Sequence, residues 1–325
     1  MRQAIARHAE RLGSGRLVLA VSGGPDSLAM LLACAEVGAR MRSRLAAAHF
    51  SHGMRPWSDR RERALVRRTA ARLGIPFEAG EGDAGRSEAS ARDARYRFLA
   101  QAASACGASA VATAHTQDDQ AETLLLHLTR GAGLRGAGAV RELSSRTIEG
   151  RELVLLRPLL RVNRSDTEAV CAEAGVAPAR DGSNRQLRYA RNRVRLRALR
   201  ELAEVNSDVR AALAGFAERA ADDDALLERL TEDAVAGFEE RSPQRVSWPK
   251  TELRKLPAPL LARALESAWR GLQGEGATLG RRKLAQASHV VARGGQVSLG
   301  KGARLMVGPG PLAQMTCSTP PAAGG

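Results

Sequence analysis

Residues 17 to 27 read Leu-Val-Leu-Ala-Val-Ser-Gly-Gly-Pro-Asp-Ser, an apolar run that passes through a glycine turn into a helical pattern. Gly23 and Gly24 allow the backbone to bend sharply, and the following helix adds free N–H donors and the positive end of its dipole. Pro25 suits the first helical position, where no N–H is needed. The stretch therefore predicts a strand, an anion-binding loop and a helix, as in a nucleotide site.

The polar side chains of this loop indicate phosphate and metal as its ligands. Ser22 and Ser27 offer hydroxyl donors, and Asp26, an anion beside anions, is best explained as a ligand of Mg²⁺. The loop lacks the lysine of the common phosphate loop and the third glycine of the dinucleotide pattern, which disfavours NTPase chemistry and hydride transfer. It resembles the S-G-G-x-D-S loop of the ATP pyrophosphatases. The alternative is a tight turn that binds no ligand.

Composition bounds the class of protein. The chain has 325 residues, of which 44% are hydrophobic, enough for about two domains with sizeable cores. No apolar run reaches the ~18 residues of a membrane span and the polar start does not resemble a signal peptide, so we expect a cytoplasmic enzyme. The four cysteines contain no C-x-x-C pair. This spacing disfavours a disulfide framework, a zinc site and an iron–sulfur cluster.

The charge balance indicates a polyanionic partner. The formal net charge is +15 and the isoelectric point is about 11.0, with 46 arginines against four lysines. Such an excess attracts nucleic acid by neutralising phosphates. A genome rich in arginine codons would explain arginine over lysine, but it would not explain the surplus of positive charge.

The first half of the chain alternates short apolar runs with helical patterns, as expected for strands joined by crossover helices. Strands are expected near residues 16–21, 44–50, 75–79, 109–114 and 153–157. Helices are expected over residues 25–37, 58–73 and 87–106. The predicted fold class is α/β, a doubly wound, mainly parallel five-stranded sheet. Ligands of such sheets lie at the carboxyl ends of the strands.

The pattern becomes helical after Pro158, and a smaller, mostly helical domain is expected to follow the sheet. Helices near 257–272 and 278–293 and a hairpin between 294 and 311 are expected there. The predicted organisation is an ATP-binding domain, a linker helix region, a small helical domain and a disordered tail, over residues 1–205, 206–245, 246–313 and 314–325.

A second motif begins at His115 and reads His-Thr-Gln-Asp-Asp-Gln-Ala-Glu-Thr. Asp119 and Glu122 are three residues apart, so a helix would place both carboxylates on one face, where they could hold Mg²⁺ or a cationic amine. Acidic residues also suit the first turn of any helix because of the dipole. The motif alone leaves both interpretations open.

Together the two motifs resemble the tRNA(Ile)-lysidine synthase family, whose members carry A-H-x-x-D-D-x-x-E-T followed by R-G-x-G. Further segments match in the same order, at residues 48–55, 91–96, 157–160, 181–184 and 189–195. Met54 stands where the family has leucine, and Gly182 stands where it has proline. The resemblance spans residues 17 to about 200 and indicates a short form without the family's further C-terminal domain.

The resemblance implies a function. The family ligates free L-lysine to the wobble cytidine of an isoleucine tRNA with the anticodon CAU, through an adenylated cytidine, and releases AMP and pyrophosphate. ATP and Mg²⁺ are the implied cofactors, and tRNA and free lysine are the implied partners, with no membrane involved. The small helical domain would bind substrate and tRNA. Family members are often dimeric, which makes a homodimer a candidate state.

The resemblance also implies roles for the residues of the two motifs. Asp119 and Glu122 would hold the lysine substrate, and Asp119 would share the metal with Asp26 or accept a proton. Pyrophosphate and metal would be bound by Ser22, Gly23, Gly24, Pro25, Asp26 and Ser27.

Roles for the basic residues have structural alternatives. Arg92 or Arg95 would stabilise charge on the adenylate, or would be plain solvated arginines. His49 and His52 would line the adenosine pocket, or would be ordinary hydrogen-bonded histidines. The arginine-rich segment 181–200 would contact tRNA phosphates, although some of its arginines would instead pair with acids of the neighbouring domain.

Aromatic residues are only 3% of the chain, so stacking platforms for bases are few. The candidates are Trp57, Tyr189 and Trp248, each of which could equally be a core or interface residue. Two rival functions remain. A tRNA-thiolating enzyme built on the same loop is disfavoured by the missing C-x-x-C, and a non-catalytic nucleotide-responsive RNA-binding protein does not need the acidic residues of the two motifs.

Overall fold

The computed structural model divides the chain into two compact units, Met1–Ala221 and Asp222–Gly325. The division falls within helix α11 (Val209–Val235). The structure describes residues 1, 3, 5, 15–37, 44–53, 56–82, 88–179, 186–274 and 277–318. The turn at 181–184 that carries part of the family resemblance lies outside the described residues.

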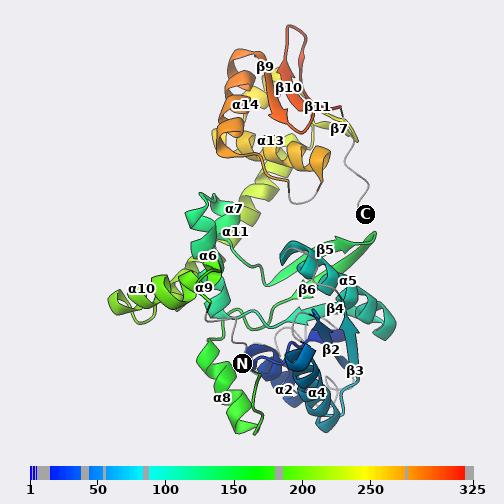
Figure 1. The fold of residues 1–325 in the computed structure, drawn as a ribbon. Coiled ribbons are helices and arrows are strands. Elements are labelled where there is room, and N and C mark those ends of the chain that lie inside the picture. The colour runs from blue at the N-terminus through cyan, green and yellow to red at the C-terminus, as the bar shows by residue number, and fades with distance from the viewer. Residues whose placement is uncertain are drawn as a thin grey trace. The chain divides into compact units, whose positions relative to one another are not determined.

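The larger unit is built on a six-stranded sheet with the strand order β3-β2-β1-β4-β6-β5 (Figure 1). All neighbouring strands are parallel except β5 and β6, which form an antiparallel pair. The strands are β1 (Arg16–Ala20), β2 (Leu45–Ser51), β3 (Phe77–Glu81), β4 (Ala108–Thr113), β5 (Leu143–Ile148) and β6 (Arg151–Leu156).

The central strands are apolar on both faces because helices cover both sides of the sheet. In β1, Leu17 and Leu19 belong to one core cluster and Val18 to another, and β4 alternates in the same way. Helices α2 (Pro25–Glu36) and α8 (Arg164–Glu173) contribute to the first cluster, whereas α5 (Glu88–Cys106) contributes Tyr96 and Leu99 to the second. This two-layer cover confirms the predicted doubly wound α/β fold.

The strand order places β1 between β2 and β4. The connection from β1 to β2 leads to one side of β1, and the connection from β3 to β4 leads to the other side. The carboxyl ends of β1, β2 and β4 therefore meet at a topological switch point, where open α/β sheets bind ligands. The other helical elements that the structure describes in this unit are α4 (Pro56–Arg72), α6 (Gln117–Thr129), α7 (Leu134–Ala137), α9 (Ala190–Arg193), the π-helical turn η2 (Val194–Ala198), α10 (Leu199–Val205) and the first part of α11.

The smaller unit contains a five-stranded antiparallel sheet with the order β7-β8-β11-β10-β9. Amphipathic helices α13 and α14 pack on it, and Trp248 and Leu305 lie fully buried in its core. The elements are β7 (Glu240–Ser242), β8 (Arg245–Pro249), α12 (Lys250–Lys255), α13 (Ala258–Gln273), α14 (Arg281–Arg293), β9 (Gly295–Gly300), β10 (Ala303–Val307) and β11 (Leu312–Cys317).

The structure corrects three expectations and confirms others. The larger sheet has six strands instead of five, because β5 reads Leu-Ser-Ser-Arg-Thr-Ile and offers no apolar run to detect. The predicted helices near 257–272 and 278–293 and the hairpin after 294 are confirmed, but the smaller unit also holds an unpredicted sheet. The predicted disorder is wrong for residues 314–317, which pair within β11. No helix in the described ranges is long and apolar enough to cross a membrane.

Candidate functional site

The loop between β1 and α2 forms a tight cradle. Gly23 has φ +93°, a conformation that favours glycine, and a Cβ added there would lie 3.4 Å from Cβ of Glu62. Ser27 Oγ accepts a hydrogen bond from Ser22 N at 3.1 Å and donates one to Gly24 O at 3.0 Å. Ser22 Oγ lies 3.1 Å from Ser27 Oγ. The two serines predicted to flank the anion site therefore face each other across the loop.

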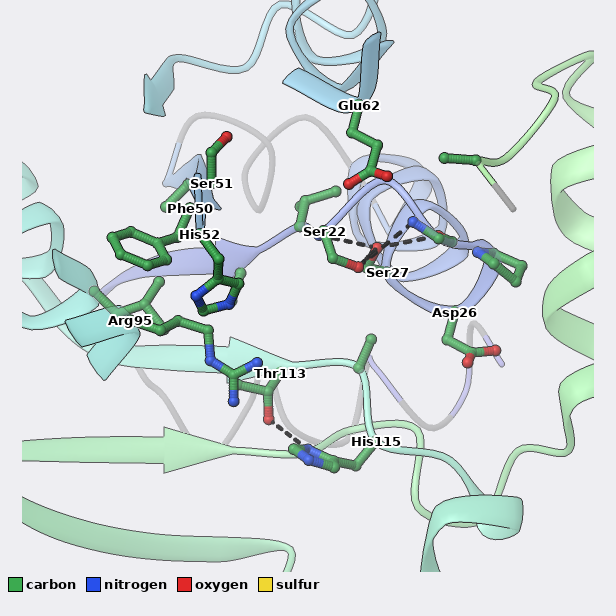
Figure 2. A pocket seen from close by; sticks show the side chains of 18 of the residues that line it. Ser22, Asp26, Ser27, Phe50, Ser51, His52, Glu62, Arg95, Thr113 and His115 are labelled. Atoms are coloured by element: carbon green, nitrogen blue, oxygen red, sulfur yellow. Dashed lines mark hydrogen bonds between the residues drawn. The ribbon is translucent and has the colours of Figure 1, made fainter. Parts of the chain in front are cut away.

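The cradle opens into a cavity of about 430 Å³ at the carboxyl ends of β1, β2 and β4 (Figure 2). Figure 2 shows side chains from all three strand ends and from α4 and α5 around it. Its polar and charged lining residues are Ser22, Asp26, Ser27, Ser51, His52, Asp59, Glu62, Arg95, Thr113, His115 and Arg164. This volume suits a small-molecule ligand of nucleotide size.

Asp26 lies in the first turn of α2 and is bound by two residues of α8. Its Oδ2 accepts a hydrogen bond from Arg164 Nη2 at 2.8 Å, and its Oδ1 accepts one from Thr167 Oγ1 at 2.6 Å. Burial opposes the charged form of Arg164, but the bond to Asp26 together with the charges of Asp26, Asp119 and Asp118 outweighs it and raises the pKa of the guanidinium. Neither partner could be inferred from the sequence, because each lies about 140 residues away from Asp26 along the chain.

Asp26 fits the way proteins hold Mg²⁺ at phosphate sites, through one or two carboxylates together with substrate phosphates and water. Each carboxylate oxygen accepts one hydrogen bond and retains a further lone pair. Among the described residues, no group of three His, Cys, Asp or Glu side chains could hold a metal by itself. A metal at Asp26 would therefore depend on the phosphates of the bound nucleotide.

The three histidines near the cavity differ in their roles. His52 lines the cavity, and its Nδ1 is buried without a hydrogen-bond partner in the described structure. His49 is only 1% exposed, does not line the cavity, and bonds Val21 O through Nδ1 at 2.8 Å. Burial lowers the pKa of both, and Arg95 further lowers that of His52. Of the predicted pair, only His52 is placed to contact a ligand in the cavity.

His115 was not singled out from the sequence as a site residue, yet it lines the cavity at the end of β4. Its Nδ1 lies 2.9 Å from Thr113 Oγ1 (Figure 2). Burial lowers its pKa to about 4, against an opposing effect of Asp119. The imidazole is therefore neutral near pH 7.

Arg95 and Arg92 are three residues apart on α5, but only Arg95 reaches the cavity. Arg95 lines the cavity, and burial lowers its pKa, whereas Arg92 is exposed and does not line it. Both guanidiniums stack on the ring of buried Tyr96, with Cζ at 5.3 Å and 5.1 Å from the ring centroid. Of the two candidates for charge stabilisation, the geometry favours Arg95.

Asp119 and Glu122 lie on one face of α6, as their spacing predicts, but they are bonded to arginines. Arg191 donates to Asp119 Oδ1 and to Glu122 Oε2, each at 2.7 Å. Arg195 donates to both oxygens of Glu122, which is only 1% exposed. We call Asp119, Glu122, Arg191 and Arg195 the arginine–carboxylate cluster.

The cluster bears on the two expectations for the arginine-rich segment: two of its arginines pair with acids, but these acids lie in the same unit, Met1–Ala221, and not in a neighbouring domain. Arg191 and Arg195 pair with acids of α6, so these two are not simply a solvated basic surface. Burial alone would raise the pKa of Asp119, but Arg191, His115 and the Thr116 N–H outweigh it and lower that pKa. Neither carboxylate lines the cavity.

The chain is similar to known proteins over most of its length. The family model of the PP-loop domain matches residues 1–202. The tRNA(Ile)-lysidine synthase of Salinispora arenicola (strain CNS-205) is 40% identical over 243 residues, which cover 73% of this chain and 72% of the relative. That of Dehalococcoides mccartyi (strain CBDB1) is 36% identical over 267 residues, which cover 79% of this chain and 57% of the relative.

The match leaves part of several relatives uncovered. The chain spans 57%, 63% and 65% of the length of the curated synthases from Dehalococcoides mccartyi, Rhodopseudomonas palustris and one Bradyrhizobium strain. Among solved structures, the U34-tRNA thiolase NcsA from Methanococcus maripaludis aligns with a TM-score of 0.53 at 12% identity, over 68% of this chain and 79% of that one. This likeness supports the fold alone.

Proposed function

Because the chain belongs to the tRNA(Ile)-lysidine synthase family of PP-loop proteins, we propose that it ligates free L-lysine to the wobble cytidine of an isoleucine tRNA with the anticodon CAU, at the expense of ATP. One observation carries this proposal beyond the family match. The serine–glycine cradle, Asp26 and a polar cavity of about 430 Å³ meet at the switch point of the sheet.

The first step is adenylation of the tRNA. The cytosine O2 attacks the α-phosphorus of ATP, a phosphorus–oxygen bond to the β-phosphate breaks, and pyrophosphate leaves. Backbone N–H groups of the Gly23–Gly24 turn, with the hydroxyls of Ser22 and Ser27, would bind the leaving group; Ser22, Gly24 and Ser27 line the cavity, whereas Gly23 does not. Mg²⁺ held by Asp26 and the phosphates would neutralise the developing charge. Arg95 would bind the adenylate phosphate from the opposite wall.

The second step transfers lysine. The neutral ε-amine attacks C2 of the activated ring, the carbon–oxygen bond to AMP breaks, AMP leaves with the electron pair, and the attacking nitrogen releases one proton to water. We assign the binding of lysine to Asp119 and Glu122. Because both carboxylates are bonded to Arg191, which is 43% exposed, entry of lysine requires this arginine to exchange at least one of its bonds.

The decisive assay incubates the purified chain with unmodified tRNA, ATP, Mg²⁺ and labelled lysine. Transfer of label to the tRNA, with one pyrophosphate released for each lysine added, is the expected result. A tRNA with another anticodon serves as the control and should remain unlabelled. Absence of both label and pyrophosphate would refute the proposal, and ATP binding without pyrophosphate release would favour the non-catalytic RNA-binding alternative.

The thiolation alternative is weakened by the cysteines. Cys34, Cys171 and Cys317 are buried and Cys106 is partly exposed. Burial raises the pKa of Cys34 to about 12 and that of Cys171 to about 11, whereas a reactive sulfur carrier needs a thiol with a lowered pKa. No described group of these residues resembles a cluster site.

A further inference from the structure

One tryptophan lies on the surface, on a helix that helps to line the cavity. Of the three tryptophans, Trp248 and Trp269 are 0% and 4% exposed, whereas Trp57 is 82% exposed. Trp57 is the second residue of α4 (Figure 1). This helix contributes Asp59 and Glu62 to the lining of the cavity. The core alternative considered for Trp57 is therefore wrong, while the same alternative holds for Trp248.

Trp57 continues a basic face of α4. At about 100° of rotation per residue, Trp57, Arg61, Arg68 and Arg72 fall within a sector of roughly 60° and extend over roughly 22 Å. The three arginines are exposed. Arg72 donates a hydrogen bond to Ala174 O at 3.3 Å, and the described structure gives no hydrogen bond or ion pair for Arg61 or Arg68. We call these four residues the α4 face.

The α4 face borders a groove. A cavity of about 830 Å³ lies between α4 and the segment that follows α8, and its lining includes all three arginines of the face with Ser58 and Thr69. The groove and the nucleotide-sized cavity have two lining residues in common, Glu62 and Ala179. A chain lying in the groove would therefore lead directly to the cradle.

We propose that the α4 face and its groove bind single-stranded tRNA nucleotides adjacent to the reacting cytidine, with one base stacked on Trp57 and the phosphates beside Arg61, Arg68 and Arg72. This inference rests on the proposed function and names a part of its RNA site. An exposed indole followed by a row of guanidiniums is the combination that binds single strands through stacking and phosphate contacts. A single nucleotide or pyrophosphate would not extend from Trp57 to Arg72, which favours a polynucleotide over a small anion.

The first experiment uses the fluorescence of the full-length chain. Because Trp248 and Trp269 are buried, quenching by RNA should come from Trp57. The probe is an anticodon stem-loop RNA carrying CAU, titrated at fixed salt. Quenching that disappears in Trp57→Phe, a variant that keeps a ring for stacking and retains the RNA affinity, is the expected result. Equal quenching in the variant and the parent would overturn the assignment of Trp57.

The second experiment measures affinity for the same RNA. Trp57→Ala should weaken binding about tenfold, as expected for the loss of one stacked base. Arg61→Ala with Arg68→Ala should weaken it further and reduce the slope of log Kd against log salt by about 1 to 2. Arg67→Ala is the matched control, because this exposed arginine neighbours Arg68 but does not line the groove. Thermal unfolding checks that each variant is folded.

The outcomes separate the two proposals. If the parent ligates lysine to tRNA but the α4 variants bind RNA as tightly as the parent, the proposed function stands and the α4 site is overturned. If the arginine variants raise the KM for ATP and leave the RNA affinity unchanged, the groove serves nucleotide phosphates and the proposal is also overturned. If the parent binds RNA through Trp57 but transfers no lysine, the proposed function fails while the RNA site stands.

Discussion

The cavity and the arginine–carboxylate cluster differ in how completely their buried polar atoms are hydrogen-bonded. In the cavity, His52 Nδ1 and Arg164 Nε are buried and have no hydrogen-bond partner within the described residues. In the cluster, both oxygens of Glu122 accept bonds from guanidinium groups. Unsatisfied buried polar atoms indicate a site for a ligand or water, whereas a closed ion-pair cluster indicates a structural element or one that must open.

This difference shows that the acidic residues of the two motifs, Asp26 and Glu122, are not equally accessible to a ligand. Asp26 is exposed to the cavity and bonded from one side by α8, so a ligand can approach it without breaking a contact. Glu122 is enclosed by arginines from a segment that the sequence suggested for tRNA phosphates. The predictions below test whether the cavity does chemistry and the cluster holds structure.

The largest effect is expected at Asp26. Asp26→Asn retains the size of the side chain and removes its charge, so pyrophosphate release should fall by about 10²-fold or more, the scale seen when one electrostatic group of a reaction site is removed. Pyrophosphate release with tRNA and ATP is the measurement. Asp166→Asn, on the exposed side of α8, is the control and should leave the rate unchanged. A normal rate in Asp26→Asn would contradict the metal and phosphate role.

At Glu122 the expected effect is on stability. Glu122→Gln leaves Arg195 without its buried anionic partner and Arg191 with Asp119 alone, and the free energy of unfolding should fall by about 3 kcal/mol. Urea unfolding measures it. The matched control is Glu81→Gln, which breaks an ion pair with Arg63 whose side chains are 66% and 43% exposed, and should cost about 0.5 kcal/mol or less.

The same Glu122 variant tests the lysine role. If Glu122 helps to hold lysine, pyrophosphate release should persist in the folded protein while transfer of labelled lysine falls. Equal loss of both steps would contradict that role and would leave Glu122 as a positioning residue for the segment that carries Arg191 and Arg195.

The sequence predicts the cradle well because its determinants are local. Gly23, Pro25 and the serines act within a few residues, so the turn and the helix start could be inferred without tertiary information. The bonds of the cluster join residues about 70 apart, and those of Asp26 join residues about 140 apart. Such pairs depend on how the elements pack, and a single sequence does not reveal which arginine meets which acid.

Burial is the second quantity that the sequence does not reveal. His49 and His52 stand in one motif, but only His52 reaches the cavity, because alternate residues of a strand point to opposite faces and β2 ends between them. His115 belongs to a quoted motif yet needed the structure to place it on the cavity wall. The β5 strand escaped detection for a related reason, since an edge strand with polar positions lacks an apolar run.

A smaller effect is expected from His115, and it depends on pH. Burial lowers the pKa of His115 to about 4 in the folded chain, against about 6.5 in the unfolded chain. Between these two pH values the imidazole is protonated mainly in the unfolded chain. The stabilisation is complete above pH ~6.5 and is lost as the pH falls toward 4. In His115→Asn, the difference in unfolding free energy between pH 7 and pH 4.5 should shrink by on the order of 2 kcal/mol.

Urea unfolding at a series of pH values measures this difference. His289→Asn is the control, because this histidine is exposed on α14 and its replacement should leave the pH dependence unchanged. An unaltered pH profile in His115→Asn would mean that the cavity is solvated enough for this imidazole to titrate normally, and the contrast between cavity and cluster would weaken.

The smallest effect is expected from alkylating the native thiols. Cys171 Sγ donates to Pro25 O at 3.4 Å directly beneath the cradle, and burial raises its pKa to about 11 and that of Cys34 to about 12. Of Cys34, Cys106 and Cys171, iodoacetamide at pH 8 should therefore modify only Cys106. Lysine transfer by the treated protein should remain within about twofold of that by the untreated protein. Peptide mass spectrometry identifies the modified sites, with the urea-unfolded chain as the fully reactive control. Rapid labelling of Cys171 in the native protein would show that the cradle opens readily. Loss of lysine transfer after labelling of Cys106 alone would support the thiolation alternative.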